Sequence, residues 1–192
     1  MPKEIKRQNK REALIEAGIA EISRCGVSDF SLRRVAQRAG VSCAAPARHF
    51  GDKHGFIAAV VDYVNAQWAE EQQRILESCG SSTREKLVAF SIGYIRFLVE
   101  KPHFRSILTL KDDKLDNTFH ISRGKTSSAT LDLISQYCKE NNLDDKIRIR
   151  KQIVIRSFIF GAAIMFINGE MPYTDEVIEI IRQNIDREFD LP

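Results

Sequence analysis

The side chains most able to do chemistry in this chain are basic ones near its N-terminus. Residues 31–53, SLRRVAQRAGVSCAAPARHFGDK, hold five Lys and Arg residues, whose side chains donate hydrogen bonds to phosphate oxygens. Across residues 1–54, eleven basic residues outnumber six acidic ones, whereas the other 138 residues carry a net charge of −2. This excess favours a module that binds nucleic acid or an anionic membrane surface, although a solvated charged face is the alternative.

The sequence contains no pattern typical of catalysis or metal binding. Its four histidines lack the HxxxH spacing that places two ligands on one helical face. No Ser/His/Asp arrangement, glycine-rich phosphate loop or HExxH motif is present. We therefore expect neither an enzyme nor a bound metal or cofactor. The four cysteines form no CxxC knuckle and no dense framework, so we expect reduced thiols in the cytoplasm; they are Cys25, Cys43, Cys79 and Cys138.

Helices are predicted to position all of these side chains. Apolar residues recur with helical period, no clean strand alternation occurs, and the longest near-apolar run, residues 157–167, is shorter than the ~20 residues that span a bilayer. The N-terminus lacks a signal-peptide core, so we expect no secretion. The fold class is therefore all-α, with about nine helices, at about 5–24, 32–39, 43–50, 53–78, 83–101, 103–110, 118–141, 145–168 and 175–189.

Residues 31–53 are predicted to form two short helices around a tight turn. Ser31 and Ser42 are placed as the N-caps, and Gly40 can adopt the positive φ that the turn requires. Pro46 predicts a loose or 3₁₀-like start for the second helix. This is the arrangement of a helix-turn-helix, whose second helix enters the DNA major groove. An ordinary corner between two helices is the alternative, but the basic residues around it favour DNA binding.

The segments SLRRVAQRAGVS and RHFGDK, at residues 31–42 and 48–53, resemble the N-terminal module of the TetR family of bacterial transcriptional regulators. The resemblance covers about fifty residues. It implies a DNA-binding domain of three helices at 1–52 and a helical ligand-binding and dimerisation domain at 53–192. It further implies a regulator, in most such proteins a repressor, that binds a palindromic operator as a homodimer and is released by a small molecule. The alternative is an all-α ligand-binding scaffold or enzyme whose basic N-terminus contacts another anionic partner, such as a membrane surface.

The same resemblance assigns DNA contacts to residues of the second short helix and the start of the next, namely Ser42, Cys43, Ala44, Ala45, Arg48, His49 and Lys53. Ser31 and Arg33, at the first short helix, are also predicted to contact DNA. Arg48 is the candidate for a bidentate guanine contact, and Lys53 matches a lysine that contacts phosphate at a helix start. His49 either contacts DNA or holds the end of its helix. Arg7, Lys10 and Arg11 are candidate phosphate contacts, with solvated surface as the alternative for each.

The chain departs from the family pattern at two places. Ala47 stands where the family usually has a tyrosine that packs beside the DNA backbone, so that contact is absent. His54 and Gly55 stand where acidic residues are common. Without those acids, the predicted helix start near Lys53 should be more attractive to phosphate.

Aromatic and aliphatic residues dominate the predicted helices after residue 83. Core packing explains such a set by default, but the resemblance favours a pocket for a small hydrophobic or aromatic effector. The assigned lining is Phe90, Tyr94, Phe97, Phe104, Phe119 and Phe158. The helix at 145–168 is apolar nearly all round and is expected to be buried on several sides. With the last helix it has surplus apolar surface, which predicts a dimer interface at Ile153, Ile164, Ile167, Val177, Ile178, Ile181 and Ile185.

Overall fold

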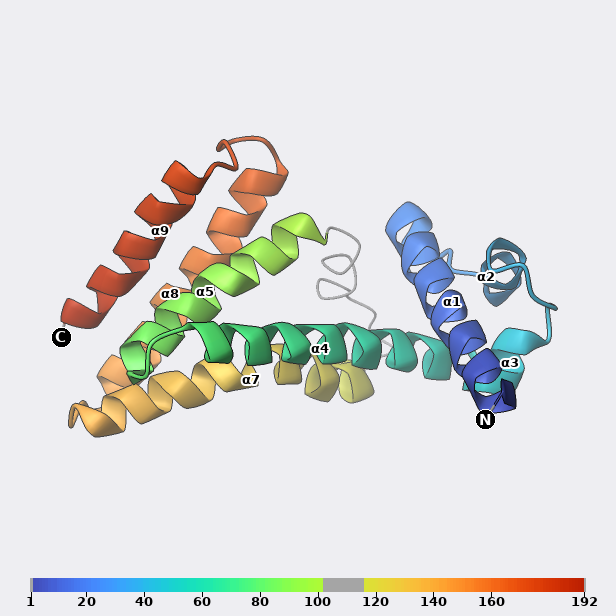
Figure 1. Ribbon diagram of the computed structural model, residues 1–192, viewed down its shortest axis with the longest axis horizontal. Helices are drawn as coiled ribbons and strands as arrows, with labels where there is room; N and C mark the ends of the chain where they lie inside the picture. The colour runs from blue at the N-terminus through green and yellow to red at the C-terminus, as the bar shows by residue number, and fades with distance from the viewer. Residues whose placement is uncertain (1, 102–115, 192) are drawn as a thin grey trace. The chain divides into compact units, whose positions relative to one another are not determined.

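The computed structural model describes residues 2–101 and 116–191, with side chains for 10–101 and 128–191. Within these ranges the chain forms eight α-helices and a final 3₁₀ turn, and no strand, as the sequence predicted (Figure 1). The helix predicted at 103–110 lies outside the described residues. The elements are α1 (Pro2–Cys25), α2 (Leu32–Arg38), α3 (Ala45–Phe50), α4 (Lys53–Ser78), α5 (Thr83–Glu100), α7 (Asp116–Glu140), α8 (Asp145–Ile167), α9 (Asp175–Arg187) and η1 (Glu188–Asp190).

The chain divides into two compact units, and the division falls inside α4. The first unit contains the chain as far as Gln67 together with the start of α7, up to Lys125. The second contains Trp68–Lys101 and the chain from Thr126 onward. One continuous helix, α4, therefore supplies residues to both units. The predicted boundary after residue 52 stays a prediction about where the DNA-binding function ends.

Several helix ends follow local signals that are visible in the sequence. Gly26 ends α1 with a φ of +71°, in the left-handed region that glycine adopts cheaply. Ser31 caps α2 by accepting a hydrogen bond from the amide of Arg34. Ser82 begins α5 in a capping box, in which it and Glu85 each accept a hydrogen bond from the other's backbone amide. These predicted ends are confirmed.

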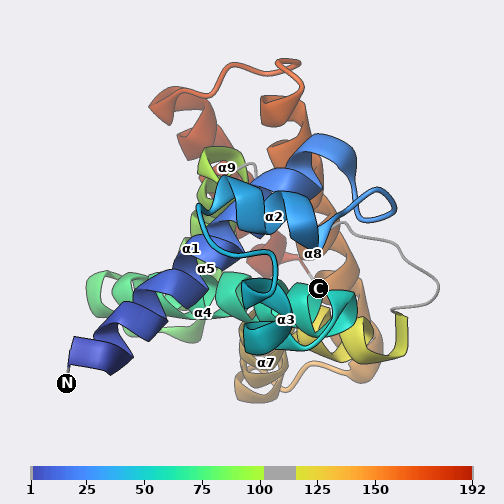
Figure 2. The ribbon, with the colours of Figure 1, turned by 90° about the vertical axis from the view of Figure 1, so that its right-hand side faces the viewer.

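The interior of the first unit contains packed aromatic rings and a close approach of two helices at one glycine. The Phe56 ring on α4 lies 5.4 Å from that of Phe30 and 4.6 Å from that of Phe50, between ring centroids. A Cβ atom added to Gly18 would lie only 2.2 Å from the Phe56 ring. Glycine at this position therefore lets α1 approach the first turns of α4. Helices α2 and α3 also belong to this unit, and α2 packs on both α1 and α3 (Figure 2).

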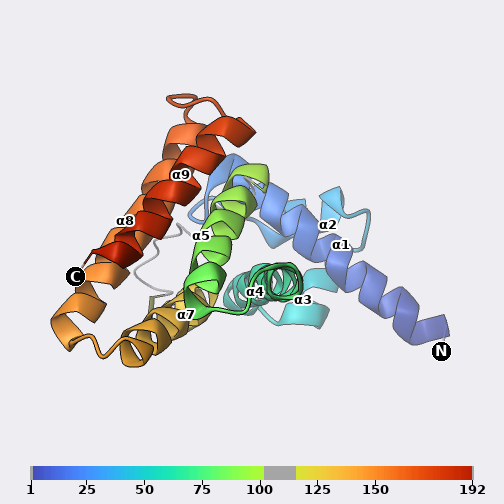
Figure 3. The same cartoon turned by 60° about the vertical axis from the view of Figure 1, so that its left-hand side comes forward.

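The second unit is built around α5, which packs against α8 and α9 (Figures 1 and 3). The buried Trp68 of α4 contacts two rings of α5, with its centroid 4.8 Å from that of Tyr94 and 5.2 Å from that of Phe97. The Phe160 ring of α8 meets Tyr94 edge to face. This aromatic cluster fills the interior where α4, α5 and α8 meet.

Polar side chains hold the C-terminal end of α9 in place. Lys151 of α8 is fully buried, and its Nζ donates to the carbonyl oxygens of Glu188 and Leu191, each at 2.8 Å. Burial lowers the pKa of Lys151, because a charged ammonium group is costly away from water. From α5, the Arg84 guanidinium donates to the Asp186 carboxylate at 2.7 Å. The position of α9 is therefore set by α5 and α8 together.

The prediction that α8 is buried on several sides is wrong. One side packs into the core through Ile155, Ile159 and Ala163. The other side leaves Ile153 61% exposed and Ile164 50% exposed. Among the described helices α5 packs extensively on α8 and α9 contacts it more sparsely, so much of the circumference of α8 is left uncovered.

Candidate nucleic-acid interface

Helices α2 and α3 form the predicted helix-turn-helix. Gly40 has a φ of +65°, which a residue with a Cβ rarely adopts, so glycine fits the turn. The amide of Val41 closes the turn by donating to the Ala36 carbonyl at 3.0 Å. Val35 and Ala36 are fully buried, and the small Ala36 side chain leaves room for the neighbouring helix.

The second helix of the helix-turn-helix, α3, is here called the recognition helix. The prediction that Ser42 is its N-cap is wrong. Helix α3 begins at Ala45, and its N-cap residue Ala44 makes no side-chain capping bond. The Ser42 carbonyl instead accepts a hydrogen bond from the Ala45 amide at 2.9 Å, three residues on, which agrees with the predicted 3₁₀-like start. Pro46 is the second residue of α3, where a backbone N–H would have no partner within the helix, so its ring is tolerated there.

The side chains that α2 and α3 expose match much of the predicted contact set. Ser42, Cys43 and Ala44 are exposed at the start of α3, and Ala45 and the predicted α2 cap Ser31 are half-buried. Two exposed arginines, Arg33 and Arg48, form no hydrogen bond or ion pair in the part of the chain that the structure describes. Both guanidinium groups are therefore available to an anionic partner.

A concave site between α1, the turn and α3 adds one basic residue to the set. It has a volume of about 350 Å³, and its lining includes Lys10, Ser42, Arg48 and His49. Lys10 comes from α1, so the structure brings it beside the recognition helix. Arg11 on the same helix lies over the Phe50 ring at 5.4 Å, so its charge is partly engaged in that contact. The side chain of Arg7 lies outside the described residues.

Lys53, assigned to phosphate by resemblance, makes hydrogen bonds within its own module. Its half-buried side chain donates from Nζ to the Val27 carbonyl at 2.7 Å and to the Ser28 carbonyl at 3.5 Å. These carbonyls belong to the loop that joins α1 to α2. The side-chain charge of Lys53 is therefore directed toward backbone oxygens of the protein.

An aspartate side chain lies at the start of α4. The Asp52 carboxylate accepts a hydrogen bond from the Gly55 amide at 2.8 Å, and this bond lowers the pKa of Asp52. An acid thus occupies the helix start although His54 and Gly55 are not acidic. Glycine is required at position 55 because a Cβ there would lie 2.1 Å from the Phe50 carbonyl oxygen. The greater attraction of this helix start for phosphate, expected from the absence of acids at positions 54 and 55, stays a prediction.

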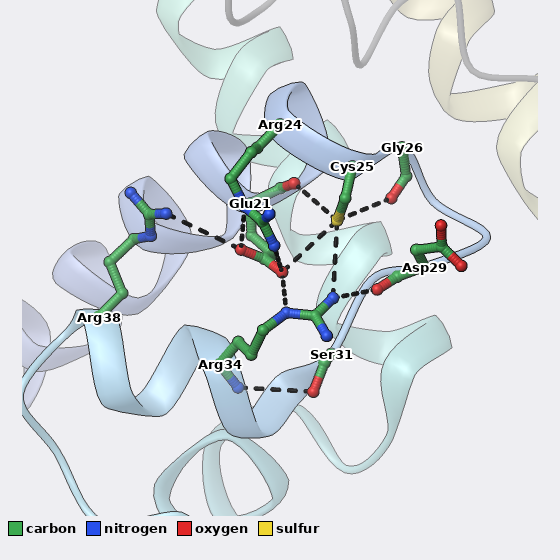
Figure 4. Close-up of polar contacts among 8 residues, drawn as sticks. All are labelled: Glu21, Arg24, Cys25, Gly26, Asp29, Ser31, Arg34 and Arg38. Atoms are coloured by element: carbon green, nitrogen blue, oxygen red, sulfur yellow. Dashed lines mark hydrogen bonds and ion pairs between the residues drawn. The ribbon is translucent and has the colours of Figure 1, made fainter.

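A buried carboxylate on α1 organises the arginines of α2 (Figure 4). Glu21 is only 1% exposed, and it accepts hydrogen bonds from Arg24, at 3.0 Å from Nη2, and from Nε of Arg34. Arg38 lies 3.9 Å from the same carboxylate. The hydrogen bond from Arg24 is the main cause that lowers the pKa of Glu21 to about 2, against the opposing effect of burial. Sequence reasoning missed Glu21, although it lies three residues after Gly18 on the buried side of α1.

The residues assigned to an effector pocket do not form one lining. Phe90, Tyr94 and Phe97 are buried, and the last two belong to the aromatic cluster with Trp68. Phe158 is 38% exposed and lies on the outer side of α8. The side chains of Phe104 and Phe119 lie outside the described residues. The pocket assignment therefore stays a prediction, except that Phe158 lies apart from the buried set.

The residues assigned to a dimer interface fall into two groups. Ile153 and Ile164 are exposed, and Ile167 and Val177 are half-buried. The other three, Ile178, Ile181 and Ile185, are between 2% and 5% exposed, because this side of α9 packs into the core of its own chain. The surplus apolar surface expected at these three positions is therefore not present.

Several exposed apolar residues of α8 and α9 line one open groove, whereas the exposed Ile164 lies outside it. Its volume is about 670 Å³, and its walls are almost wholly apolar. The polar side chains in the lining are Ser157 and Asn184. The main apolar contributors are Ile153, Phe158, Met165, Met171, Val177 and Ile180. Of these, Phe158, Met165, Met171 and Ile180 were not among the predicted interface residues.

Two further observations concern other classes of site. None of the helices, over the residues that are described, is long and apolar enough to cross a membrane. Across the same residues, His, Cys, Asp and Glu side chains form no group of three arranged to hold a metal ion.

Comparison with known proteins bears on the helix-turn-helix first. The model of bacterial regulatory proteins of the tetR family matches residues 14–60, from the middle of α1 into α4. The chain is 31% identical over 93 residues to the HTH-type transcriptional regulator BetI of Stenotrophomonas maltophilia (strain R551-3), covering 48% of this chain and 47% of that protein. It is 37% identical over 75 residues to BetI of Burkholderia ambifaria (strain MC40-6), of which it covers 39%. The chain thus matches less than half the length of these relatives.

The fold of the whole chain is also shared with solved structures. A TetR family transcription regulator from Marinobacter aquaeolei VT8 superposes with a TM-score of 0.79 over 98% of both chains, at 20% sequence identity. This likeness establishes the fold, and the relatives named above are transcription regulators rather than enzymes. Residues 14–60 thus carry the helix-turn-helix module of the tetR family of bacterial regulatory proteins, and the chain as a whole shares the all-helical fold of a TetR family transcription regulator.

Proposed function

We propose that this protein represses transcription by binding a palindromic DNA operator as a homodimer. The observation that carries the proposal is the surface of the helix-turn-helix, where Arg33 and Arg48 are exposed and make no bonds to the described part of the chain. Small residues at the start of α3 allow the backbone to approach base edges closely. Arg48 supplies a guanidinium for guanine, whereas Arg33 and Lys10 supply charge for phosphates.

A second copy of this chain is the proposed occupant of the groove between α8 and α9. An apolar groove of about 670 Å³ is costly to leave in water, and an identical surface on a second chain can cover it about a two-fold axis. A two-fold dimer presents two recognition helices to two half-sites. Half-sites read in this way lie one DNA turn apart, about 34–36 Å, which predicts an inverted repeat.

Release by a small hydrophobic or aromatic molecule is the remaining part of the proposal. This part is supported by the aromatic cluster of Trp68, Tyr94 and Phe97, in which side chains of α4 and α5 pack together. Trp68 lies on the same helix that begins at Lys53, so a molecule bound beside Trp68 would favour one position of that helix. Differential affinity for two states typically gives a coupling of about 1–3 kcal/mol.

Selection of the purified chain against random duplex DNA tests the proposal. We expect enrichment of an inverted repeat, and an affinity for it that falls linearly with salt on logarithmic axes. Enrichment of no repeat, or binding to anionic vesicles in preference to every duplex, would exclude an operator-binding function.

Arg48→Ala tests the assignment of base recognition. We expect the variant to lose preference at one base pair of each half-site, because a bidentate guanine contact contributes about 1–3 kcal/mol of discrimination. The matched control is Arg33→Ala, which should weaken binding to all sequences alike. The measurement is affinity for a panel of operators with single base changes. An unchanged preference in Arg48→Ala would contradict the assignment.

A further inference from the structure

Cationic side chains hold three successive carbonyl groups in the loop between α1 and α2. Lys53 donates to the carbonyl oxygens of Val27, at 2.7 Å, and Ser28, at 3.5 Å. The next carbonyl, that of Asp29, accepts a hydrogen bond from Nη2 of Arg34. The loop is therefore held on one side by the first residue of α4 and on the other by a residue of α2.

Arg34 is itself fixed at both ends. Its Nε donates to the buried Glu21 carboxylate, and its backbone amide donates to the Ser31 hydroxyl that caps α2 (Figure 4). The chain of contacts thus runs from Lys53 through the loop carbonyls to Arg34 and then to Ser31. It ends at the first turn of α2, where the exposed Arg33 lies.

From this geometry we infer that Lys53 is a positioning residue for the N-terminus of α2 and does not bind phosphate through its side chain. The inference rests on the proposed DNA binding. An ammonium group that donates to the Val27 carbonyl at 2.7 Å is already directed into the protein, and the Lys53 side chain is half-buried. Moving it to a phosphate would leave the loop carbonyls to find other donors.

The arrangement links α4 to the DNA-binding surface through hydrogen bonds rather than through packing alone. When the first turn of α4 shifts, Lys53 carries the loop with it, and Arg34 transmits the shift to the cap of α2. Arg33 then moves relative to the DNA backbone. Glu21 keeps Arg34 in place during such a movement, because its carboxylate also binds Arg24 and is buried.

The variant Lys53→Met distinguishes a positioning role from direct phosphate binding, through the salt dependence of operator binding. A side chain that contacts phosphate reduces the slope of log K against log salt by about 1 when it is removed. Arg33→Ala should lower the slope by about 1, and Lys53→Met should lower the affinity by about tenfold. Because the inference places the effect of Lys53 on Arg33, the two roles are compared in the Arg33→Ala chain, where we expect the addition of Lys53→Met to leave the slope unchanged. A further fall of about 1 in that slope, or an unchanged affinity of Lys53→Met alone, would overturn the inference.

A double variant distinguishes positioning from a general loss of folding. If Lys53 acts through Arg33, then Lys53→Met should have little further effect on operator affinity in the Arg33→Ala chain. Affinities are referred to the active fraction, determined by stoichiometric titration at low salt. Full additivity of the two changes would show that Lys53 acts independently of Arg33 and would overturn the inference. Failure of the wild-type chain to bind any duplex would be a different result, since it would refute the proposed function itself.

Discussion

Glu21 shows how one buried charge can order a surface that is otherwise positive. Its carboxylate is 1% exposed and neutralises part of the charge of Arg24, Arg34 and Arg38. A buried carboxylate without such partners would be strongly unfavourable. Charge counting recorded Glu21 only as one of six acids in the N-terminal segment. Its position on the buried side of α1, seven residues after Leu14, is the signal that could have identified it.

The stability of the first unit should depend on pH through Glu21. Its pKa of about 2 in the folded chain lies below the ordinary value of 4.5, so its contribution is complete above pH 4.5 and is lost as the pH falls toward 2. We expect Glu21→Gln to lower the free energy of unfolding by about 1–3 kcal/mol at pH 7, and by less at pH 3. Urea unfolding of both chains at the two pH values measures the difference.

Glu179 provides the matched control for this prediction. Its pKa is also lowered to about 2, mainly by the hydrogen bond from Arg182, but both side chains of this pair are nearly half exposed. Solvent screens an exposed pair, so Glu179→Gln should change the unfolding free energy little at either pH. Equal effects of the two substitutions would contradict the importance given to the burial of Glu21.

The approach of α1 to α4 depends on the absence of a side chain at Gly18. Intrinsic helix propensity alone predicts that Gly18→Ala stabilises α1, by up to about 1 kcal/mol. Because the new Cβ would overlap the Phe56 ring, we expect a destabilisation of about 1–3 kcal/mol instead. Chemical unfolding of the purified variant shows whether its free energy of unfolding rises or falls.

Phe56→Leu gives a test that the Phe56 ring is the obstacle. This substitution alone should destabilise the chain, because it leaves space in the cluster with Phe30 and Phe50. Combined with Gly18→Ala, it should cost less than the two changes measured separately, since the smaller side chain admits the new methyl group. Strict additivity would show that the two helices do not meet at this pair.

The assembly of the whole molecule should depend on the outer side of α8. Ile153 is 61% exposed and lines the α8–α9 groove, so Ile153→Asp can be made without unfolding the protomer. We expect this variant to sediment as a monomer. It should also bind the operator more weakly, because the helix-turn-helix of a single protomer contacts only one half-site. Buried residues such as Ile181 are unsuitable for this test, since a charge there would disrupt the core.

Leu76→Asp is the control for Ile153→Asp. Leu76 is also an exposed apolar residue, at 40%, but it lies on α4 and does not line the groove. Its substitution should leave the sedimentation of the chain unchanged. Sedimentation of Ile153→Asp as a dimer would show that the groove is not the contact between two copies.

The sequence alone specified the all-helical class, most helix ends and the helix-turn-helix. These features depend on residues only a few positions apart, such as the Ser31 and Ser82 caps and the positive φ of Gly26 and Gly40. One local prediction was wrong, because the turn before α3 uses the backbone of Ser42 where a side-chain cap was expected.

Tertiary structure decided which predicted residues face outward and which charges are already engaged. Helical periodicity marks an apolar side of α9, but only packing against the core shows that Ile178, Ile181 and Ile185 are covered by their own chain. Likewise, the partner of Lys53 is a carbonyl 26 residues away, at Val27. Sequence spacing describes neighbours along one helix, whereas contacts between helices depend on how the helices pack. That packing separates the arginines without a bond to the described part of the chain, Arg33 and Arg48, from those that bind Glu21.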